Sequence, residues 1–344
     1  MKNVLVLKKK HSLKDVIKVI DDNSNGYVIL VKEDYTLIGI ITDGDIRRAV
    51  LNNKVNLKSV INYNPVFILQ SNVKDEALNL LRYKGISQLP VVDDQNKLVD
   101  VIDREKRDIN FKTNYVIIMA GGLGSRLGSL TKDTPKPMLN VGGRPLLENI
   151  IKSFIESGFN NFIICVNYKS NIIENYFKDG SKLGVKISYV KEDKRMGTAG
   201  ALSLIEIKFN QPFFVVNGDI LTTVKFENLL EYHKSKKSIA TMGVKRFEYQ
   251  LPYGTINIDK NDRMIKISEK PKFSSLINAG IYVLSPEVIS LIPKKEFYNI
   301  TTLFEKTALK FNNVFTFPID EYWLDIGHES DYEKANNDIK INKS

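Results

Sequence analysis

Short apolar strands alternate with helical stretches after residue 115, and this alternation constrains the fold more than any other feature. The expected strands are 115–120, 161–167, 186–191, 213–217, 238–245, 253–258, 264–268, 276–284 and 313–318. The expected helices are 145–157, 170–179, 198–207, 225–235, 287–291, 299–310 and 329–339. Strands connected through helices form parallel sheets with crossover helices. The pattern therefore predicts an α/β domain with a mainly parallel sheet over 114–344.

The first 110 residues contain a weak internal repeat of about 60 residues. Residues 12–20 resemble residues 72–81, because each stretch begins with a polar cap candidate and continues with apolar residues at helical spacing. A glycine and two short strands follow each stretch. This pattern predicts a smaller α+β domain over 1–110, built from two tandem units.

Several classes of protein are excluded by composition. Cys165 is the single cysteine and lies in an apolar run, so we expect a buried thiol without a disulfide or thiolate metal cage. No apolar run approaches the ~20 residues of a membrane helix, and the N-terminus shows no secretory signal. A cytoplasmic protein is expected. The net charge of +10 is scattered, and the aromatic residues are spread evenly. Neither nucleic acid nor membrane is therefore an expected partner.

A glycine-rich turn, residues 120–128, follows the first strand of the α/β region directly. Such a turn lets backbone N–H groups approach phosphate oxygens closely. It is not a P-loop, because no Gly-Lys-Ser/Thr follows it. It is also a poor dinucleotide fingerprint, because Leu127 occupies the position of the third small residue. The turn indicates phosphate binding and disfavours hydride transfer.

Residues 121–147 closely resemble the signature of the sugar-1-phosphate nucleotidylyltransferases. A Gly-Gly-x-Gly-x-Arg-Leu turn, a Thr-x-x-x-Pro-Lys-Pro loop and a Gly-x-Pro-Leu helix start are all present at the family spacing. One departure is Gly128-Ser129, where the family often has a bulkier residue and a proline, and it concerns loop rigidity. The resemblance extends over about 115–340 and implies a Rossmann-like catalytic domain. Residues 192–202 look most like the guanylyltransferase branch.

The resemblance implies that the enzyme joins a sugar 1-phosphate to the α-phosphorus of a nucleoside triphosphate and releases pyrophosphate. Both reactants are polyanions, so catalysis depends on positioning and electrostatic stabilisation. Arg126 and Lys136 are the implied catalytic cations, and Asp219 and Asp325 the implied Mg²⁺ ligands. The implied nucleotide contacts are Ala120, Gly121, Gly122, Gly124, Ser125, Glu192, Gly197 and Thr198. The implied sugar contacts are Gly254, Glu269, Lys270, Asn278 and Ala279.

The expected substrates are GTP and glucosamine 1-phosphate or mannose 1-phosphate, for bacterial surface glycans of the nonulosonate type. A uridylyl-, thymidylyl- or cytidylyltransferase, or a non-catalytic nucleotide sensor, remains the alternative. Single residues also have plainer interpretations. Asp219 can be a turn residue, Asp325 a helix cap, and Glu269 with Lys270 a surface ion pair. His328 stands where many relatives have threonine, and its role is open.

Residues 1–108 resemble a CBS-domain pair through the segment Gly-Ile-Ile-Thr-Asp-Gly-Asp at 39–45. The resemblance implies that Thr42 and Asp45 contact the phosphate and ribose of an adenine nucleotide. The second unit departs from the motif, and Asp103 would repel a phosphate at the threonine position. The alternative is a module that only docks, dimerises or positions the catalytic domain. Because CBS pairs often associate, a homodimer is expected.

Overall fold

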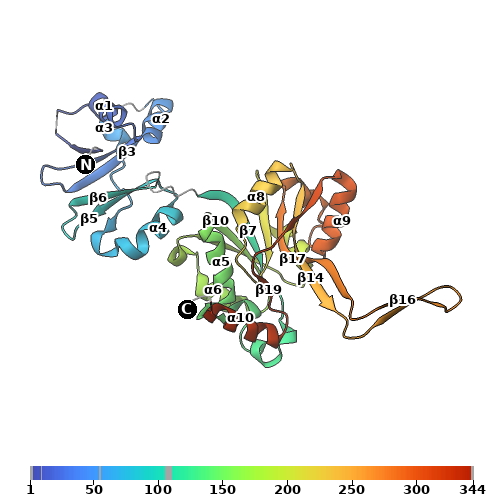
Figure 1. Ribbon diagram of the computed structural model, residues 1–344. Helices are drawn as coiled ribbons and strands as arrows, with labels where there is room; N and C mark the ends of the chain where they lie inside the picture. The colour runs from blue at the N-terminus through green and yellow to red at the C-terminus, as the bar shows by residue number, and fades with distance from the viewer. Residues whose placement is uncertain (1–2, 9, 54–55, 105–110, 342–344) are drawn as a thin grey trace. The chain divides into compact units, whose positions relative to one another are not determined.

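The computed structural model describes residues 3–8, 10–53, 56–104 and 111–341 (Figure 1). The chain divides into two compact units. One comprises Met1–Asn110 with Ser181–Gly184, and the other Phe111–Gly180 with Val185–Ser344. We call them the N-terminal unit and, after the catalytic domain that the sequence resemblance implies, the catalytic unit, and we describe each by itself. Among the helices of the described ranges, none has both the length and the apolar character needed to span a bilayer.

The N-terminal unit consists of two similar halves. Its elements are β1 (Val4–Val6), α1 (Leu13–Asn23), β2 (Tyr27–Val31), β3 (Leu37–Thr42), α2 (Asp43–Leu51), α3 (Leu57–Val60), β4 (Ile68–Leu69), α4 (Val73–Lys84), β5 (Gln88–Val92) and β6 (Leu98–Asp103). Each half forms a three-stranded sheet, β1-β2-β3 or β4-β5-β6, with one parallel and one antiparallel pairing. The apolar stripe of α1, with Val16 and Ile20, packs on Val28 and Leu30 of β2. The expected repeat is confirmed.

The catalytic unit is built around one large sheet. Its elements are β7 (Lys112–Met119), β8 (Asn140–Val141), β9 (Arg144–Pro145), α5 (Leu146–Glu156), β10 (Phe159–Val166), α6 (Ser170–Phe177), β11 (Lys186–Lys191), α7 (Gly197–Gly200), β12 (Phe213–Asn217), β13 (Ile220–Thr222), α8 (Phe226–Ser235), β14 (Ala240–Gln250), β15 (Thr255–Ile258), β16 (Met264–Ser268), β17 (Lys272–Leu284), α9 (Ile300–Phe311), β18 (Val314–Pro318), β19 (Trp323–Asp325) and α10 (Glu329–Ile341).

Seven strands form the sheet, in the order β11-β10-β7-β12-β17-β14-β18. Six of them run parallel, and β17 alone is antiparallel to its two neighbours. The expected α/β fold with a mainly parallel sheet is therefore confirmed. Strand β7 begins at Lys112, three residues before the expected strand 115–120, where Lys112 pairs with Phe159 of β10.

Apolar side chains cover both faces of this sheet. On one face Ile117, Ile163 and Val215 pack with the first residues of α9. On the other face the Phe154 ring of α5 stacks on Phe226 and makes edge contacts with further rings of the core. Cys165 is fully buried on the first face, and burial raises the pKa of its thiol. The expected buried thiol is confirmed.

Two expected α-helices differ from what the sequence suggested. Residues 198–207 form only α7 and a 3₁₀ turn, Ala201–Leu204. Glycines explain the break, because Gly197 has a φ of +71° and a Cβ on Gly200 would lie 2.5 Å from the Glu296 carbonyl oxygen. The stretch expected as a helix at 287–291 is a 3₁₀ helix, Pro286–Leu291. Beyond the sheet, β14 and β17 continue into an antiparallel ribbon of β15 and β16, which projects from the body of the unit (Figure 1).

His233 makes the stability of the catalytic unit dependent on pH. Its ring is 1% exposed, with Nδ1 2.9 Å from Thr241 Oγ1 and Nε2 3.1 Å from Ser285 Oγ. Burial, followed by the charge of Lys234, lowers the pKa of His233 to about 4. The folded state therefore favours the neutral ring. The contribution of His233 to the free energy of unfolding is complete above about pH 6.5 and is lost as pH falls towards 4.

We expect the free energy of unfolding to fall by about 3 kcal/mol through this group between pH 6.5 and 4. The single tryptophan, Trp323, lies in the catalytic unit, so its fluorescence during urea titrations reports on that unit. A His233→Gln variant should show a flatter pH dependence in this window, and the exposed His328→Gln should not. An identical slope in wild type and His233→Gln would contradict the prediction.

Candidate active site

A pocket of about 400 Å³ opens beside the carboxyl ends of β7 and β12. Parallel α/β sheets bind ligands at this edge. Its lining includes the following residues expected from sequence: Gly121, Gly122, Gly124, Ser125, Arg126, Lys136, Glu192, Gly197, Thr198 and Asp219. The fold thus gathers ten separate candidates, contributed by segments between residues 121 and 219, into one cavity.

The glycine-rich turn leaves β7 and becomes a 3₁₀ run over Ser125–Thr131. Gly124 has a φ of +66°, and its carbonyl accepts a hydrogen bond of 3.0 Å from Thr131 Oγ1. Within the run, Gly128 breaks the helical geometry with φ +52° and ψ −120°. The glycine at the position where the sequence departs from the family is therefore used as a kink. Ala120, also expected at the nucleotide, is buried, and its N–H donates to the Cys165 carbonyl.

Lys136 and Asp219 form an ion pair in the pocket, with 2.5 Å between Nζ and Oδ2. Lys136 lies between two prolines in a short 3₁₀ turn and is 8% exposed. Asp219 follows β12, and two backbone hydrogen bonds hold it in place. The Gly218 N–H donates to the Met119 carbonyl, and the Ile326 N–H donates to the Asp219 carbonyl. The pair places a positive charge on a rigid turn opposite an acid, beside the carboxyl ends of two neighbouring strands.

Asp325 lies beside this pair. It ends β19, which pairs antiparallel with β13, so that Asp325 faces Ile220, the residue after Asp219. Partial loss of hydration raises the pKa of the Asp325 carboxyl, and the Asp219 charge raises this pKa further, whereas Lys136 and Arg126 lower it. The sequence-distant acids are thus close enough to repel one another. The described residues hold no cluster of three or more acidic, cysteine or histidine side chains that suits a metal ion.

Arg126 approaches the loop before α10. A Cβ on Gly327 would lie 3.9 Å from Arg126 Nη1, and Gly327 lines the pocket. The carboxylate of Asp331 caps α10, because it accepts hydrogen bonds from the N–H groups of Gly327 and His328. The alternative interpretation of Asp325 as the helix cap is therefore wrong. His328 joins this cap through its backbone N–H.

Glu192 follows β11 and reaches across the glycine-rich turn. Its Oε2 accepts a hydrogen bond of 3.1 Å from the Met196 N–H, and a Cβ on Gly121 would lie 2.6 Å from its Oε1. Burial raises the pKa of the Glu192 carboxyl, and the bond from Met196 lowers it. Glycine at position 121 thus leaves room for a carboxylate in the pocket.

Gly197, next to this loop, permits a tight turn that a side chain would prevent. A Cβ there would lie 2.7 Å from the Tyr298 carbonyl oxygen, and φ is +71°. We expect Gly197→Ala to lower the free energy of unfolding by about 3 kcal/mol, from left-handed strain and overpacking. Gly122→Ala is the matched control, because no atom lies within 4 Å of its Cβ position. Equal unfolding midpoints, measured by Trp323 fluorescence, would contradict this expectation.

The five residues expected at the sugar lie outside the pocket lining. Gly254 and Glu269 face each other where the ribbon joins the sheet. A Cβ added to Gly254 would lie 2.9 Å from Glu269 Oε2. Lys270 is exposed, and the ion pairs of the described residues do not join it to Glu269. Asn278 and Ala279 lie on β17, where Asn278 Oδ1 accepts from the Gly280 N–H and the Ala279 carbonyl from Trp323 Nε1.

Sequence reasoning missed several lining residues, among them Arg195, Asn217 and Phe297. Asn217 stands two residues before the expected ligand Asp219, so position alone gave a usable signal. Arg195 lies inside the loop that was matched to the family. Phe297 comes from an irregular segment before α9 and carries no local motif.

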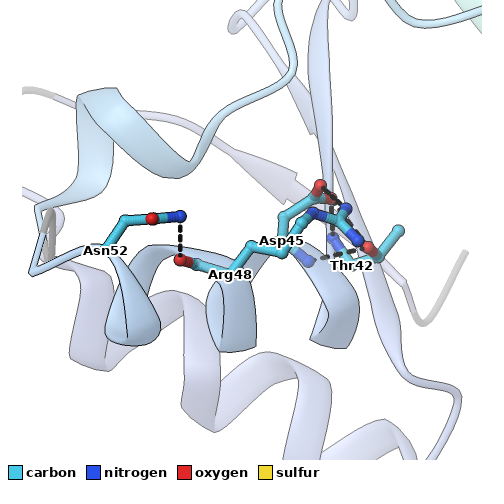
Figure 2. A network of polar contacts seen from close by, with 4 residues as sticks. All are labelled: Thr42, Asp45, Arg48 and Asn52. Carbon is cyan, nitrogen blue, oxygen red and sulfur yellow. Dashed lines mark hydrogen bonds and ion pairs between the residues drawn. The ribbon is translucent and has the colours of Figure 1, made fainter.

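Thr42 and Asp45, expected at an adenine nucleotide, bind each other at the start of α2 (Figure 2). The Thr42 N–H donates to Asp45 Oδ2 at 2.9 Å, and the Asp45 N–H donates back to Thr42 Oγ1 at 3.2 Å. Arg48 holds the other carboxylate oxygen at 2.6 Å. These contacts form a capping box, which satisfies N–H groups at the helix start.

Comparison with known proteins gives two family matches, Nucleotidyl transferase over residues 115–342 and CBS domain over 1–52 and 57–106. The probable mannose-1-phosphate guanylyltransferase 1 of Oryza sativa is 35% identical over 224 residues, which is 63% of this chain and 62% of the rice protein. The mannose-1-phosphate guanyltransferase of Saccharomyces cerevisiae is 32% identical over 227 residues, with the same coverage. The matched region thus spans about three fifths of these relatives.

Solved structures show the same likeness. HddC from Yersinia pseudotuberculosis complexed with GMP-PN is 28% identical, with a TM-score of 0.51 over 66% of this chain and 99% of that one. A putative glucose-1-phosphate thymidylyltransferase from Bacillus anthracis is 26% identical, with a TM-score of 0.55 over 66% of this chain and 96% of that one.

Proposed function

The chain belongs to the nucleotidyl transferase family, and on this premise we propose that it transfers GMP from GTP to a sugar 1-phosphate and releases pyrophosphate. The observation that carries the proposal is the ion pair of Lys136 and Asp219, with Asp325 beside it, in a pocket that the glycine-rich turn borders. Polyanionic reactants need such positive groups, and no nucleophilic side chain is required for direct displacement.

The roles follow from charge and position. The N–H groups of the turn would hold the triphosphate, as glycine-rich loops do in other phosphate sites. The fork of donors on Arg126 would brace the phosphates. Lys136 would shift from Asp219 towards the oxygens of the α-phosphorus, where negative charge grows as the sugar phosphate attacks and pyrophosphate leaves.

The acids fit a divalent cation. Mg²⁺ prefers oxygen ligands, keeps several waters and is held by one or two carboxylates together with substrate phosphates. Asp219 and Asp325 form such a donor pair, and their mutual repulsion would be relieved by a cation between them. Bound there, Mg²⁺ would polarise phosphate oxygens as a Lewis acid.

Guanine is the proposed base because of Glu192. The Watson–Crick edge of guanine presents N1–H and the 2-amino group side by side, and a carboxylate accepts from both. Uracil and thymine instead present carbonyl oxygens on each side of their N3–H, which a carboxylate repels. Relatives described as guanylyltransferases, and an HddC structure with GMP-PN, support the same choice.

The proposed sugar is mannose 1-phosphate or glucosamine 1-phosphate, used in surface glycan synthesis of the nonulosonate type. The names of the relatives support mannose 1-phosphate. The test is pyrophosphate release with GTP, UTP, dTTP and CTP, each combined with mannose, glucosamine and glucose 1-phosphates. Strong turnover of GTP with one of the first two sugars is expected. Strong turnover of another triphosphate beside little GTP turnover would overturn the guanylyl assignment.

Glu192→Gln tests the base contact separately, because the amide replaces one acceptor by a donor. We expect kcat/KM for GTP to fall about 10- to 100-fold, the range for losing one paired base contact, with a smaller change for UTP. The matched control is Glu206→Gln, an exposed acid of the same unit.

We further propose that the first CBS domain binds an adenine nucleotide through Thr42 and Asp45, by exchanging part of the capping box for ligand contacts. Calorimetry of the full chain with AMP tests it. Heat of binding that disappears in Thr42→Val is expected. No heat with wild type, or equal heat with Thr42→Val, would refute the assignment.

A further inference from the structure

The ribbon of β15 and β16 exposes an unusual amount of apolar surface. Exposed fractions of its large side chains range from 55% to 67%, for Ile256, Ile258, Met264, Ile265 and Ile267. Scattered exposed leucines or isoleucines are normal on monomers, but contiguous apolar patches of this kind mark interaction surfaces.

The strand register places these side chains together. Ile256 pairs directly with Ile267, and Ile258 pairs with Met264, so these four share one face of the ribbon. Asn257 and Lys266 pair on the opposite face. A register shift between Asn257 and Ile258 leaves Ile265 as the extra residue. One face is thus apolar and the other polar, as in a sheet whose apolar face packs against another protein surface.

The apolar surface continues at the base of the ribbon. Tyr249 of β14 stacks on Phe273 of β17 with ring centroids 5.4 Å apart, and Phe247 lies two residues before Tyr249. All three rings are more than 40% exposed, as is Tyr253 in the connection before β15. Two strands alone are marginally stable in water, so such an arm gains stability from a partner.

We propose that the apolar face of this ribbon packs against the same face of a second copy of the chain. The nine large apolar side chains of ribbon and base expose on the order of 1,000 Å², and a stable interface buries about 800 Å² from each partner. A two-fold axis brings identical patches together. The ribbon carries two acidic and three basic residues, Asp259, Asp262, Lys260, Arg263 and Lys266, a balance that favours neither a lipid surface nor nucleic acid.

The interface has a consequence for the substrate, which rests on the proposed function. Gly254 and Glu269 lie at the root of the ribbon, with the Glu269 carboxylate over the Gly254 backbone. Fixing the ribbon in a dimer fixes this root. The KM for the sugar 1-phosphate should therefore rise several-fold in a monomeric variant, while the KM for the triphosphate changes little.

The test compares two variants by analytical ultracentrifugation of the full chain over a range of concentrations. Ile256→Lys with Ile267→Lys places charge on the apolar face and should raise the dissociation constant of the dimer about 100-fold or more. Asn257→Lys adds one lysine to the opposite face and should leave the dimer intact. Both sites are exposed, so far-UV circular dichroism and urea midpoints should match wild type.

Hydrogen exchange gives a second readout. Amides of 255–268 should become better protected as protein concentration rises through the dissociation constant. A wild type that stays monomeric, a dimer that survives the double lysine variant, equal loss in Asn257→Lys, or unchanged protection would each overturn the proposal. An inactive wild type that still dimerises through the ribbon would leave this interface standing and remove only the proposed function.

Discussion

Replacing Lys136 by methionine is expected to lower kcat/KM for nucleotidyl transfer about 10²–10³-fold, the effect of losing one preorganised electrostatic donor. Methionine keeps an unbranched chain in a position that is 8% exposed, so packing is preserved while the charge is lost. Without Lys136, Asp219 and Asp325 repel each other with less compensation. Steady-state pyrophosphate release, with GTP and the preferred sugar 1-phosphate, measures the effect.

The matched control is Lys208→Met, which removes an exposed lysine of the same unit. Its activity should equal that of wild type, because Lys208 lies outside the pocket lining. If Lys136→Met kept activity within threefold of wild type, Lys136 would have no role in charge neutralisation, and the ion pair with Asp219 would be structural.

Asp219→Asn is expected to lower kcat by about 10³-fold and to raise the Mg²⁺ concentration needed for half-maximal rate. The amide keeps one oxygen but loses the charge that attracts a cation. Stability should change little, because the lost attraction to Lys136 is offset by the relieved repulsion with Asp325. Titrating the initial rate with Mg²⁺, beside urea unfolding followed by Trp323 fluorescence, separates the two effects.

Asp320→Asn is the control, since this exposed acid precedes β19 by three residues and lies outside the pocket. It should leave both the rate and its Mg²⁺ dependence unchanged. An active Asp219→Asn enzyme with an unaltered Mg²⁺ titration would show that Asp219 is only a turn residue, the plainer interpretation of the sequence.

The fold and the nucleotide side of the site could be predicted because their signals are local. A few consecutive residues are enough to recognise each feature: the strand before Gly121, the prolines around Lys136 and the strand ending near Asp219. The carboxyl ends of parallel strands share one edge, so such segments meet whatever their distance along the chain. The structure places these candidates in one pocket, and their individual roles stay predictions.

Other features depend on long-range packing and left no such signal. Phe297 reaches the pocket from an irregular segment. The expected helix over 198–207 ends early because the Gly197 and Gly200 backbones approach residues 296–298, a constraint that helical spacing does not reveal. The capping of α10 by Asp331, rather than Asp325, likewise depends on how the chain turns at Gly327.

The pairing of β13 with β19 joins residues about a hundred positions apart and sets Asp219 beside Asp325. During synthesis the ribosome releases the glycine-rich turn and Lys136 long before β19 leaves the exit tunnel. A nascent chain therefore contains the turn that is proposed to hold phosphate before it contains Asp325, and under this proposal it becomes competent only when β19 pairs with β13. The proposed active site is in this way completed late in the folding of each molecule.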